Sequence, residues 1–319
     1  MRLPDVTVLI VTYNSDLNKL YRTLYSVLRQ KNVIFEIVIS DDGSDSFESA
    51  KIEKYLLSRG CGEFSIMSSE KNFGTVINIQ KGLSVSKGKY VCSISPGDFF
   101  YGEKSLSEIY EYANKYDLES VFGVPLLYNS DLSEKVKFYP KFIPMFPKMY
   151  NWGIFNGFFS KTSVLYGNNP VGATFFRKRV HYTKYINMIA GKIVYLEDKP
   201  ISLLHLYNGG KVAFYDRPFI WYEYGTGIST SGNEKWTEKL RKDNESLGKM
   251  LLSLYPKNRI IRARYGTEKL KKFRYLEVKI FDKLMVMFSY IFRIKKNIIK
   301  GREDKDLYRI INESYSGDY

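Results

Sequence analysis

The sequence has little cysteine and no long apolar run. Its 319 residues include two cysteines, Cys61 and Cys92, which fall in different predicted elements without metal-ligand spacing. This excludes a disulfide framework and favours reduced thiols in a cytosolic protein. The longest apolar run, 284–292, is about half of the ~18–20 residues that cross a bilayer. The first residues lead into a strand without a signal-peptide layout, so we expect a cytoplasmic protein that does not span a membrane.

Positive charge is abundant and unevenly placed. The formal net charge is +15, and the stretch from Lys257 to Lys305 alone holds sixteen Lys and Arg against five acidic residues. Such an excess predicts an anionic partner: nucleic acid, an acidic membrane surface or a phosphorylated substrate. The 44% apolar and 26% charged residues are otherwise typical of a soluble protein with a core.

Strand and helix patterns alternate through the first 130 residues. The apolar, β-branched runs 6–12, 35–40, 63–68 and 90–95 are separated by segments of helical pattern ending near 30, 59 and 87. A helix over 105–116 and a strand over 121–128 follow. This order predicts parallel βαβ units in an α/β fold with a doubly wound sheet.

The second half is less regular. Residues 133–170 are rich in aromatics, Pro, Gly and Asn, which indicates a long functional loop. We expect a strand within 172–177, helices over 180–190 and 198–207, a strand over 211–214, and a Gly/Thr-rich loop over 221–230. A charged helix over 233–255 and one or two basic amphipathic helices after Pro256 complete the chain. The predicted units are a catalytic domain over 1–230, with a donor half to about 130, and a basic helical region over 231–319.

Three acidic points follow predicted strands: Asp41-Asp42, Asp98 and Glu197-Asp198. The first two share one edge of a parallel sheet, where such folds bind nucleotides. Each also has a simpler explanation, because Asp and Glu cap helices and stabilise turns. By themselves, these residues leave both alternatives open.

The four motifs together resemble the family 2 glycosyltransferases. They are VTVLIVTYNS, EIVISDDGSDS, the stretch from NFG to SISPGD, and LED at 196–198, and the similarity extends over about residues 5–230. The resemblance implies a GT-A fold, a Rossmann-like and mostly parallel sheet flanked by helices, here with a C-terminal helical extension. It also implies an inverting, nucleotide-sugar-dependent enzyme without a covalent intermediate.

The resemblance also assigns roles to residues. Asp198 becomes the catalytic base with Glu197 beside it, and the nucleotide-binding positions become Thr12, Tyr13, Asn14, Asp41, Asp42, Asn72, Gly74, Ser95, Pro96 and Gly97. Most family members carry an Asp-x-Asp metal motif where this chain has Ser95-Pro96-Gly97-Asp98. Asp98 is therefore the one predicted ligand for Mn²⁺ or Mg²⁺, and weak or absent metal dependence is an open alternative.

Other segments predict contacts with the acceptor or with a surface. Trp152, Trp221 and Tyr224 are aromatic side chains on which a sugar ring could stack, although they could equally serve as core residues. The apolar face of the basic tail, from Phe273 to Phe292, suits an anionic membrane surface, or packing on the catalytic domain or on a second copy in a homodimer. His181, with Lys178 and Arg179, fits a solvated helix face better than a phosphate site, and His205 fits a core position.

We therefore predict a hexosyl- or N-acetylhexosaminyltransferase of bacterial type. It would transfer a sugar from a nucleotide-sugar, a UDP-sugar, to a lipid-linked glycan in surface polysaccharide synthesis, at the inner face of the cell membrane. Two alternatives remain: a non-catalytic GT-A-like scaffold or glycan-binding subunit, motivated by Gly97, and a basic nucleic-acid-binding protein. The second is disfavoured because the basic tail carries no nucleic-acid motif.

Overall fold

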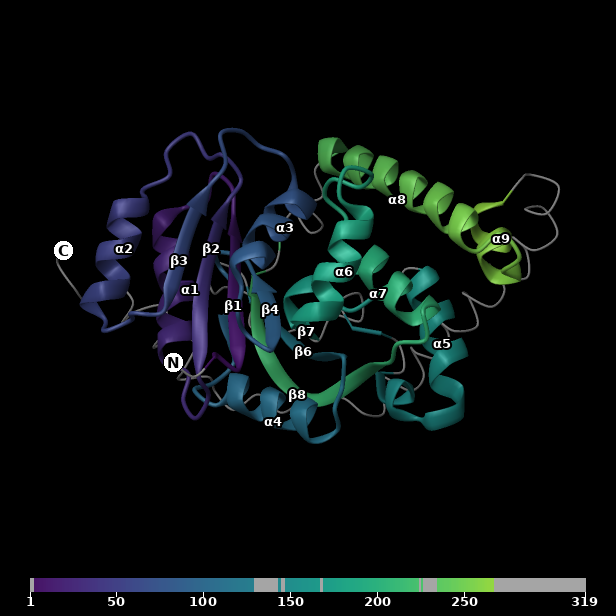
Figure 1. Cartoon of the computed structure of the whole chain (residues 1–319), viewed down its shortest axis with the longest axis horizontal. Helices are drawn as coiled ribbons and strands as arrows, with labels where there is room; N and C mark the ends of the chain where they lie inside the picture. The colour runs from purple at the N-terminus through teal and green to yellow at the C-terminus, as the bar shows by residue number, and fades with distance from the viewer. Residues whose placement is uncertain are drawn as a thin grey trace.

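A computed structural model describes residues 3–128, 143–144, 147–166, 169–223, 225 and 234–266 of the chain. Its sheet has eight strands in the order β3-β2-β1-β4-β7-β6-β8-β5 (Figure 1). The strands are β1 Val6–Thr12, β2 Phe35–Asp41, β3 Phe64–Ser68, β4 Tyr90–Ile94, β5 Phe99–Phe100, β6 Ser120–Tyr128, β7 Phe175–Lys178 and β8 Val212–Glu223. Strands β1 to β4 are parallel, as are β6 and β8, whereas β7 and β5 run antiparallel to their neighbours.

Helices cover both faces of the sheet. They are α1 Leu17–Leu28, α2 Ser49–Ser58, α3 Thr75–Val85, α4 Ser105–Lys115, α5 Gly153–Leu165, α6 Arg179–Ile189, α7 Asp198–Tyr207, α8 Glu234–Leu254 and α9 Arg259–Tyr265. Helices α1, α2 and α4 share one hydrophobic cluster, and α3 and α5 to α9 share the other. The result is a three-layer α/β fold, as the strand and helix order predicted.

Side-chain alternation along β1 shows how the sheet serves two cores. Val6, Val8 and Ile10 belong to the cluster beneath α1, α2 and α4, whereas Leu9 belongs to the cluster beneath α3 and its neighbours. Successive residues of a strand point to opposite faces, and a strand covered on both faces needs apolar residues at both sets of positions. This explains why the first strand reads as a continuous apolar run.

Two parts of the second half differ from the sequence prediction. The segment 133–170, expected to be a loop, contains a 3₁₀ turn at Pro147–Asn151 and the 13-residue helix α5. Strand β8 runs on to Glu223, so Trp221 lies in a strand rather than in the predicted loop. In both places aromatic residues are used for packing: Tyr150 and Trp221 are each at most 1% exposed.

Helices α8 and α9 pack on the same core as the sheet. Leu247 and Leu251 of α8 and Ile261 of α9 are fully buried in the cluster that also holds α3 and α5 to α7. Gly248 of α8 is in close contact with the Tyr265 ring, where an added Cβ would come within 2.5 Å. The chain from 234 to 266 therefore packs on the catalytic fold, while most of the basic tail lies outside the described residues.

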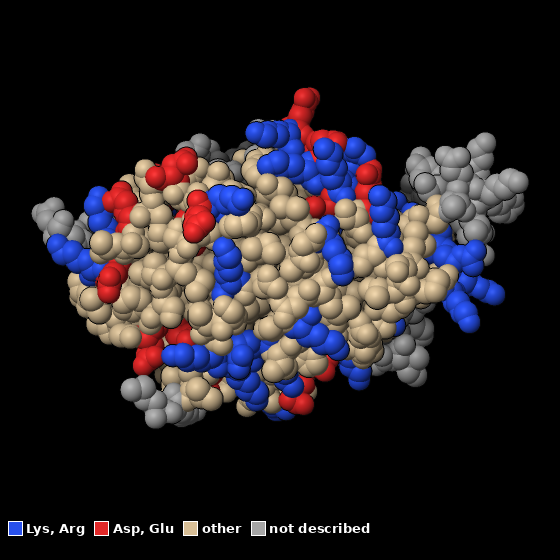
Figure 2. All heavy atoms as spheres, turned by 45° about the horizontal axis from the view of Figure 1, so that its top comes forward, with Lys and Arg blue, Asp and Glu red and all other residues tan. Residues whose placement is uncertain are grey.

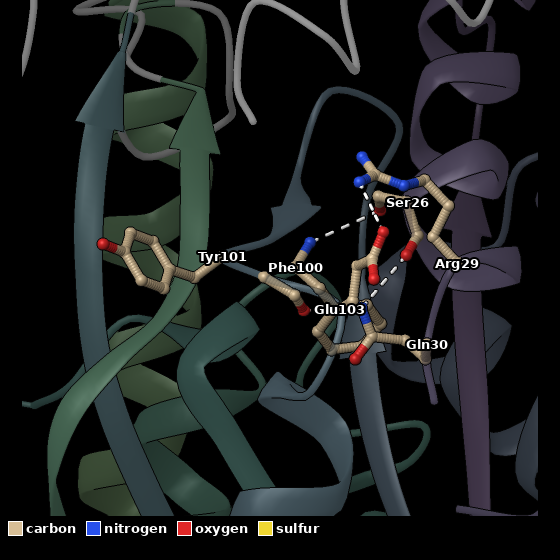
Figure 3. A pocket seen from close by; sticks show the side chains of 7 residues that line it. Ser26, Arg29, Gln30, Phe100, Tyr101 and Glu103 are labelled. Carbon is tan, nitrogen blue, oxygen red and sulfur yellow. Dashed lines mark hydrogen bonds and ion pairs between the residues drawn. The ribbon is translucent and has the colours of Figure 1, made fainter. Parts of the chain in front are cut away.

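A small cavity lies between α1 and β5 (Figure 3). Its volume of ≈10 Å³ is roughly the room that one water molecule needs. In Figure 3, Arg29 reaches Glu103 at 2.7 Å, while the Tyr101 ring points away from them. The cavity is thus a gap beside a surface ion pair and is too small for a substrate.

Candidate active site

Two of the predicted acidic points, Asp41-Asp42 and Asp98, lie at the carboxyl edge of the sheet. Thr12 at the end of β1 pairs with Asp41 at the end of β2, and Ile10 pairs with Ile94 at the end of β4. Asp98 follows β4 by one tight turn, so it lies at the same edge as Asp41. In an open α/β sheet, ligands bind at this edge, and the structure confirms that the motifs share it.

Asp41 organises its own loop. Its carboxylate accepts hydrogen bonds from the Ser44 N–H at 2.8 Å, from the Ser44 hydroxyl and from the Ser68 hydroxyl at 2.8 Å. The next turn contains Gly43 at φ +74, and an added Cβ there would come within 2.5 Å of the backbone of Lys71. Residues 41–45 and 69–74 are thereby packed into one surface at the end of β2.

Asp42 ties this surface to the start of α3. Its two oxygens accept the N–H groups of Phe73 at 2.9 Å and Gly74 at 2.8 Å, and its own N–H donates to Thr12 O at 2.9 Å. Burial raises the pKa of Asp42, and the two N–H donors partly oppose that shift. The predicted nucleotide residues Thr12, Asp42 and Gly74 are therefore one connected unit, and Asn72 lies in the same loop.

Tyr13 and Asn14 extend from the end of β1. Asn14 has φ +45, and it exchanges hydrogen bonds with Asp45 in both directions, at 3.2 and 2.9 Å. Its N–H also donates to the Ser44 hydroxyl at 2.7 Å. Tyr13 is 44% exposed. Asn14 thus fixes the loop between the first two strands, and the Tyr13 ring is available to stack on a base.

The turn from Ser95 to Asp98 is closed by the Asp98 carboxylate. Asp98 accepts the N–H of Ser95 at 3.2 Å and that of Glu223 at 3.3 Å, and it is 4% exposed. Burial raises the pKa of Asp98 to about 7, against the lowering effect of the two N–H donors. Ser95 is exposed and Pro96 partly so. Asp98 therefore stabilises the turn, and Ser95 and Pro96 are the residues of the turn that solvent can reach.

Glu223 takes the place of a side chain at position 97. Gly97 has φ +104, and an added Cβ would lie 2.4 Å from Glu223 Oε2. Glu223, at the end of β8, binds the Lys19 ammonium through both oxygens, at 2.7 and 2.8 Å. The sequence motif has no acid at position 97, and the Glu223 carboxylate from the distant strand β8 occupies the space next to that position. Sequence reasoning missed Glu223 because it placed that residue in a loop.

The surroundings of Asp98 decide how well a divalent cation fits there. Mg²⁺ and Mn²⁺ need oxygen ligands with free lone pairs in an open arrangement. Asp98 already binds two backbone N–H groups, and Glu223 already binds the ammonium of Lys19. Both carboxylates are therefore already engaged by protein donors and do not fit an open cation site in this arrangement.

Glu197 and Asp198 lie at the start of α7. Asp198 is half-buried and its Oδ1 accepts the Lys199 N–H at 2.7 Å. Glu197 is 9% exposed, and its Oε2 has no hydrogen-bond partner among the described residues. Burial raises the pKa of both carboxyls, and the cationic Arg177 opposes that rise. The pair is therefore a buried acidic group next to a cationic side chain.

A backbone contact connects this pair to the nucleotide loop. Val194 O, three residues before Glu197, accepts the Val76 N–H at 3.0 Å in the first turn of α3. An added Cβ at Gly74 would come within 2.3 Å of the Val194 side chain. Two elements more than 100 residues apart in sequence are thus in direct contact.

Asp243 of α8 fixes the segment that leads to the acidic pair. Its carboxylate accepts three consecutive N–H groups, from Val194 at 3.1 Å, Tyr195 at 2.6 Å and Leu196 at 2.9 Å. Asp243 is 5% exposed. The sequence showed a charged helix here but gave no indication that one of its acids is buried. Asp243 is a positioning residue for Glu197 and Asp198.

The outcome differs among the three residues that were predicted to contact the acceptor. Trp152 is 59% exposed and remains available to a sugar. Trp221 is 1% exposed in a cluster with Phe99, Leu126 and Tyr128, so its assignment to the acceptor site is wrong, because its ring is used for packing. Tyr224 lies outside the described residues.

Comparison with known proteins agrees with this geometry. The model of the glycosyl transferase family 2 matches residues 7–179. The chain belongs to that family. No curated protein sequence matches it significantly.

Solved structures support the GT-A fold of this family 2 member. Staphylococcus aureus TarS 1-349 in complex with UDP-GlcNAc is similar with a TM-score of 0.53 and 14% identity, over 86% of this chain and 79% of that one. The complex of TarS 1-349 with UDP gives 0.52 and 14%, over 81% and 71%. A mannosyltransferase from Pyrobaculum calidifontis in complex with GDP-Man and Mn²⁺ gives 0.54 and 11%, over 79% and 65%. The fold and the family are therefore established together.

Proposed function

We propose that this glycosyltransferase transfers a hexose or N-acetylhexosamine from a UDP-sugar to a hydroxyl of a glycan acceptor, with inversion. The observation that supports the proposal is the contact of Val194 with Gly74 and Val76, because Val194 lies three residues before Glu197 and the contacted residues belong to the predicted donor loop. Family membership supports the reaction class. UDP and UDP-GlcNAc in the TarS complexes support the choice of donor.

The proposed chemistry is a single displacement. Asp198 accepts the proton of the attacking hydroxyl, the new bond forms at the anomeric carbon, and the bond to the diphosphate oxygen breaks on the opposite face. General-base catalysis of this kind contributes about 10²–10⁴-fold. Glu197, with its unpaired buried oxygen, would accept a hydrogen bond from the acceptor and orient it. The cationic Arg177 opposes the burial-induced rise in the pKa of both carboxyls and so favours the ionised form that a base requires.

Positive charge at the leaving diphosphate is the next requirement of this chemistry. The contacts of Asp98 do not fit the divalent cation predicted from the sequence, so basic side chains would have to stabilise the charge on the departing phosphate. The packing of Asp98 and the Lys19–Glu223 pair support the alternative of weak metal dependence. Lys71 and Lys81, both within 5.3 Å of the Phe73 ring centre, place ammonium groups near the nucleotide loop.

The acceptor is proposed to be a lipid-linked oligosaccharide at the cytoplasmic face of the membrane. On the described surface, Lys and Arg are mixed with acidic residues, notably along α8 (Figure 2). The tail beyond Gly266 carries thirteen Lys and Arg against eight acidic residues, which is +5 of the net charge of +15. No helix in the described part of the chain is long and apolar enough to cross a membrane. A membrane surface, the catalytic fold and a second copy of the chain remain alternative partners of the tail.

A panel of nucleotide-sugars tests the proposal. Each is incubated with the full chain and a lipid-linked acceptor extract, with Mn²⁺ and with EDTA, and release of the nucleoside diphosphate is measured. We expect UDP release from one UDP-sugar to rise on adding acceptor, and activity in EDTA to stay within about tenfold of that in Mn²⁺. Absence of release from every donor under both conditions would favour the non-catalytic scaffold.

Membrane binding is tested with liposomes. The full chain is compared with a chain ending at Gly266, which keeps the buried Ile261 of α9 in place. We expect binding to anionic vesicles that weakens with salt and is lost on truncation. Equal binding by both chains would assign the tail to packing on protein instead.

A further inference from the structure

The chain has two histidines, and both contact the same carboxylate. His181 and His205 are separated by 24 positions in sequence, and Glu119 is more than 60 positions from either. His181 Nε2 lies 3.3 Å from one oxygen of Glu119, and His205 Nε2 lies 3.4 Å from the other. Taken separately, the two histidines suggested a solvated face and a core position; their convergence was not visible in the sequence.

Three different elements bring these groups together. Glu119 immediately precedes β6, His181 is in the first turn of α6, and His205 is in the last turn of α7. The His205 ring is held against Gly210, where an added Cβ would come within 2.3 Å of the ring. The two imidazoles are 5.6 Å apart between centres and nearly perpendicular. His181 and Glu119 are each about a third exposed, so solvent reaches the cluster.

The three groups are close enough for one ion, although the two imidazole nitrogens contact different oxygens of Glu119, so an ion would bind one of these oxygens or both. Charge-assisted hydrogen bonds between imidazolium and carboxylate are about 2.7–2.9 Å long, shorter than either contact here. A tetrahedral Zn²⁺ with bonds of about 2.0–2.1 Å separates neighbouring ligand atoms by roughly 3.3–3.4 Å. The three ligand atoms all lie within 4.8 Å of one another.

We propose that Glu119, His181 and His205 bind one Zn²⁺ ion, in a site separate from the donor site. Two imidazole nitrogens and a carboxylate are a ligand set that zinc accepts, with the exposed side leaving a fourth position for water. Without metal, His205 Nε2 is 3.1 Å from Lys211 O and can donate to it. Binding therefore requires the tautomer in which the Nε2 lone pair is free and the proton sits on Nδ1.

The position of the site indicates a structural role. Strand β6 ends at Tyr128, whose hydroxyl donates to Gly97 O in the turn at the carboxyl edge of the sheet. Glu119 immediately precedes the start of β6, which runs parallel to β8, and therefore lies at the opposite edge from the predicted donor loops. His205 follows Asp198 by seven residues of α7, about 10 Å at 1.5 Å per residue. A metal ion joining α7 to α6 and β6 would fix the helix whose first residue is the predicted base.

The test is zinc binding by the tag-free full chain. Metal is first removed with a chelator and dialysed away, and Zn²⁺ is then titrated by calorimetry with metal content checked by mass spectrometry. We expect one Zn²⁺ per chain and a higher midpoint of thermal unfolding with Zn²⁺. His181→Ala removes a half-exposed ligand and should weaken binding more than the ~10–100-fold that follows loss of an outer-shell partner.

Asp117→Asn is the matched control, because Asp117 is a nearby exposed acid that pairs with Lys178 and not with either histidine. It should bind Zn²⁺ like the unsubstituted chain, as should Cys61→Ser, which removes the half-buried thiol. Equal zinc affinity in His181→Ala and the unsubstituted chain would overturn the proposal, as would absence of saturable binding in both. The readout is independent of sugar transfer, so its failure leaves the proposed function untouched.

Discussion

Replacing Asp243 by Asn should separate positioning of the catalytic pair from the chemistry itself. The carboxylate binds three backbone N–H groups at 2.6–3.1 Å while only 5% exposed. Asn keeps one oxygen, which can still accept from Tyr195 and Leu196, but its NH₂ group then faces the Val194 N–H. One buried donor loses its acceptor and the other two lose a charged partner.

The cost can be estimated from these contacts. An unsatisfied buried donor costs about 1–3 kcal/mol, and exchanging charged for neutral hydrogen bonds costs about 1 kcal/mol each. We therefore expect the free energy of unfolding to fall by about 3–5 kcal/mol, which lowers the unfolding midpoint by several degrees. We also expect kcat to fall by at least about tenfold, because the segment it holds leads directly to Glu197 and Asp198.

The assay combines thermal unfolding with steady-state kinetics for donor and acceptor. Glu245→Gln is the control, since Glu245 lies on the exposed side of the same helix and pairs only with Arg241 in the contacts described. It should leave both quantities nearly unchanged. An Asp243→Asn variant with unaltered kcat and a midpoint within about one degree of the parent would refute the positioning role.

Three further predictions concern the turn and the aromatic residues. Gly97→Ala should destabilise the fold more than Gly209→Ala, as measured by urea unfolding. Both glycines have positive φ, but only position 97 faces the Glu223 carboxylate of β8. Equal losses of stability would contradict this reasoning. Burial raises the pKa of Asp98 to about 7, so its contribution to stability is complete below pH ~4 and is lost as the pH rises to about 7. Asp98→Asn should flatten the fall in stability between about pH 4 and 7, and an unchanged slope would count against the buried position of this carboxyl. Trp221→Ala should cost about 3–5 kcal/mol of stability. Trp152→Ala should leave stability intact and raise the KM for the acceptor. The reverse pattern would contradict the buried position of Trp221 and the exposed position of Trp152.

The sequence predicted the first half of the fold well, for a physical reason. Strands β1, β2 and β4 are covered on both faces, so each is a short apolar run with a turn at its end, and the helices between them carry clear periodic patterns. The same pattern put the motifs at one edge, because parallel strands end together. The local sequence was sufficient to predict these strands and helices because residues close together in the chain determine each of them.

Long-range contacts were beyond such reasoning. Glu223 replaces a side chain at Gly97, Asp243 binds the segment before Glu197, and the two histidines converge on Glu119, each across many residues. Nothing in the neighbouring sequence of any of these residues indicates the partner. The aromatic content of 133–170 was likewise ambiguous, because aromatic residues serve packing as well as binding.

The most direct test of the account is the Asp198→Asn variant in an acceptor-dependent transfer assay. The substitution keeps the shape of the side chain and its hydrogen bond with the Lys199 N–H while removing the proton acceptor. We predict a loss of kcat of about 10²–10⁴-fold with an unchanged affinity for UDP and an unchanged unfolding midpoint. Transfer at the parent rate by a folded Asp198→Asn chain would contradict the assignment of Asp198 as the base.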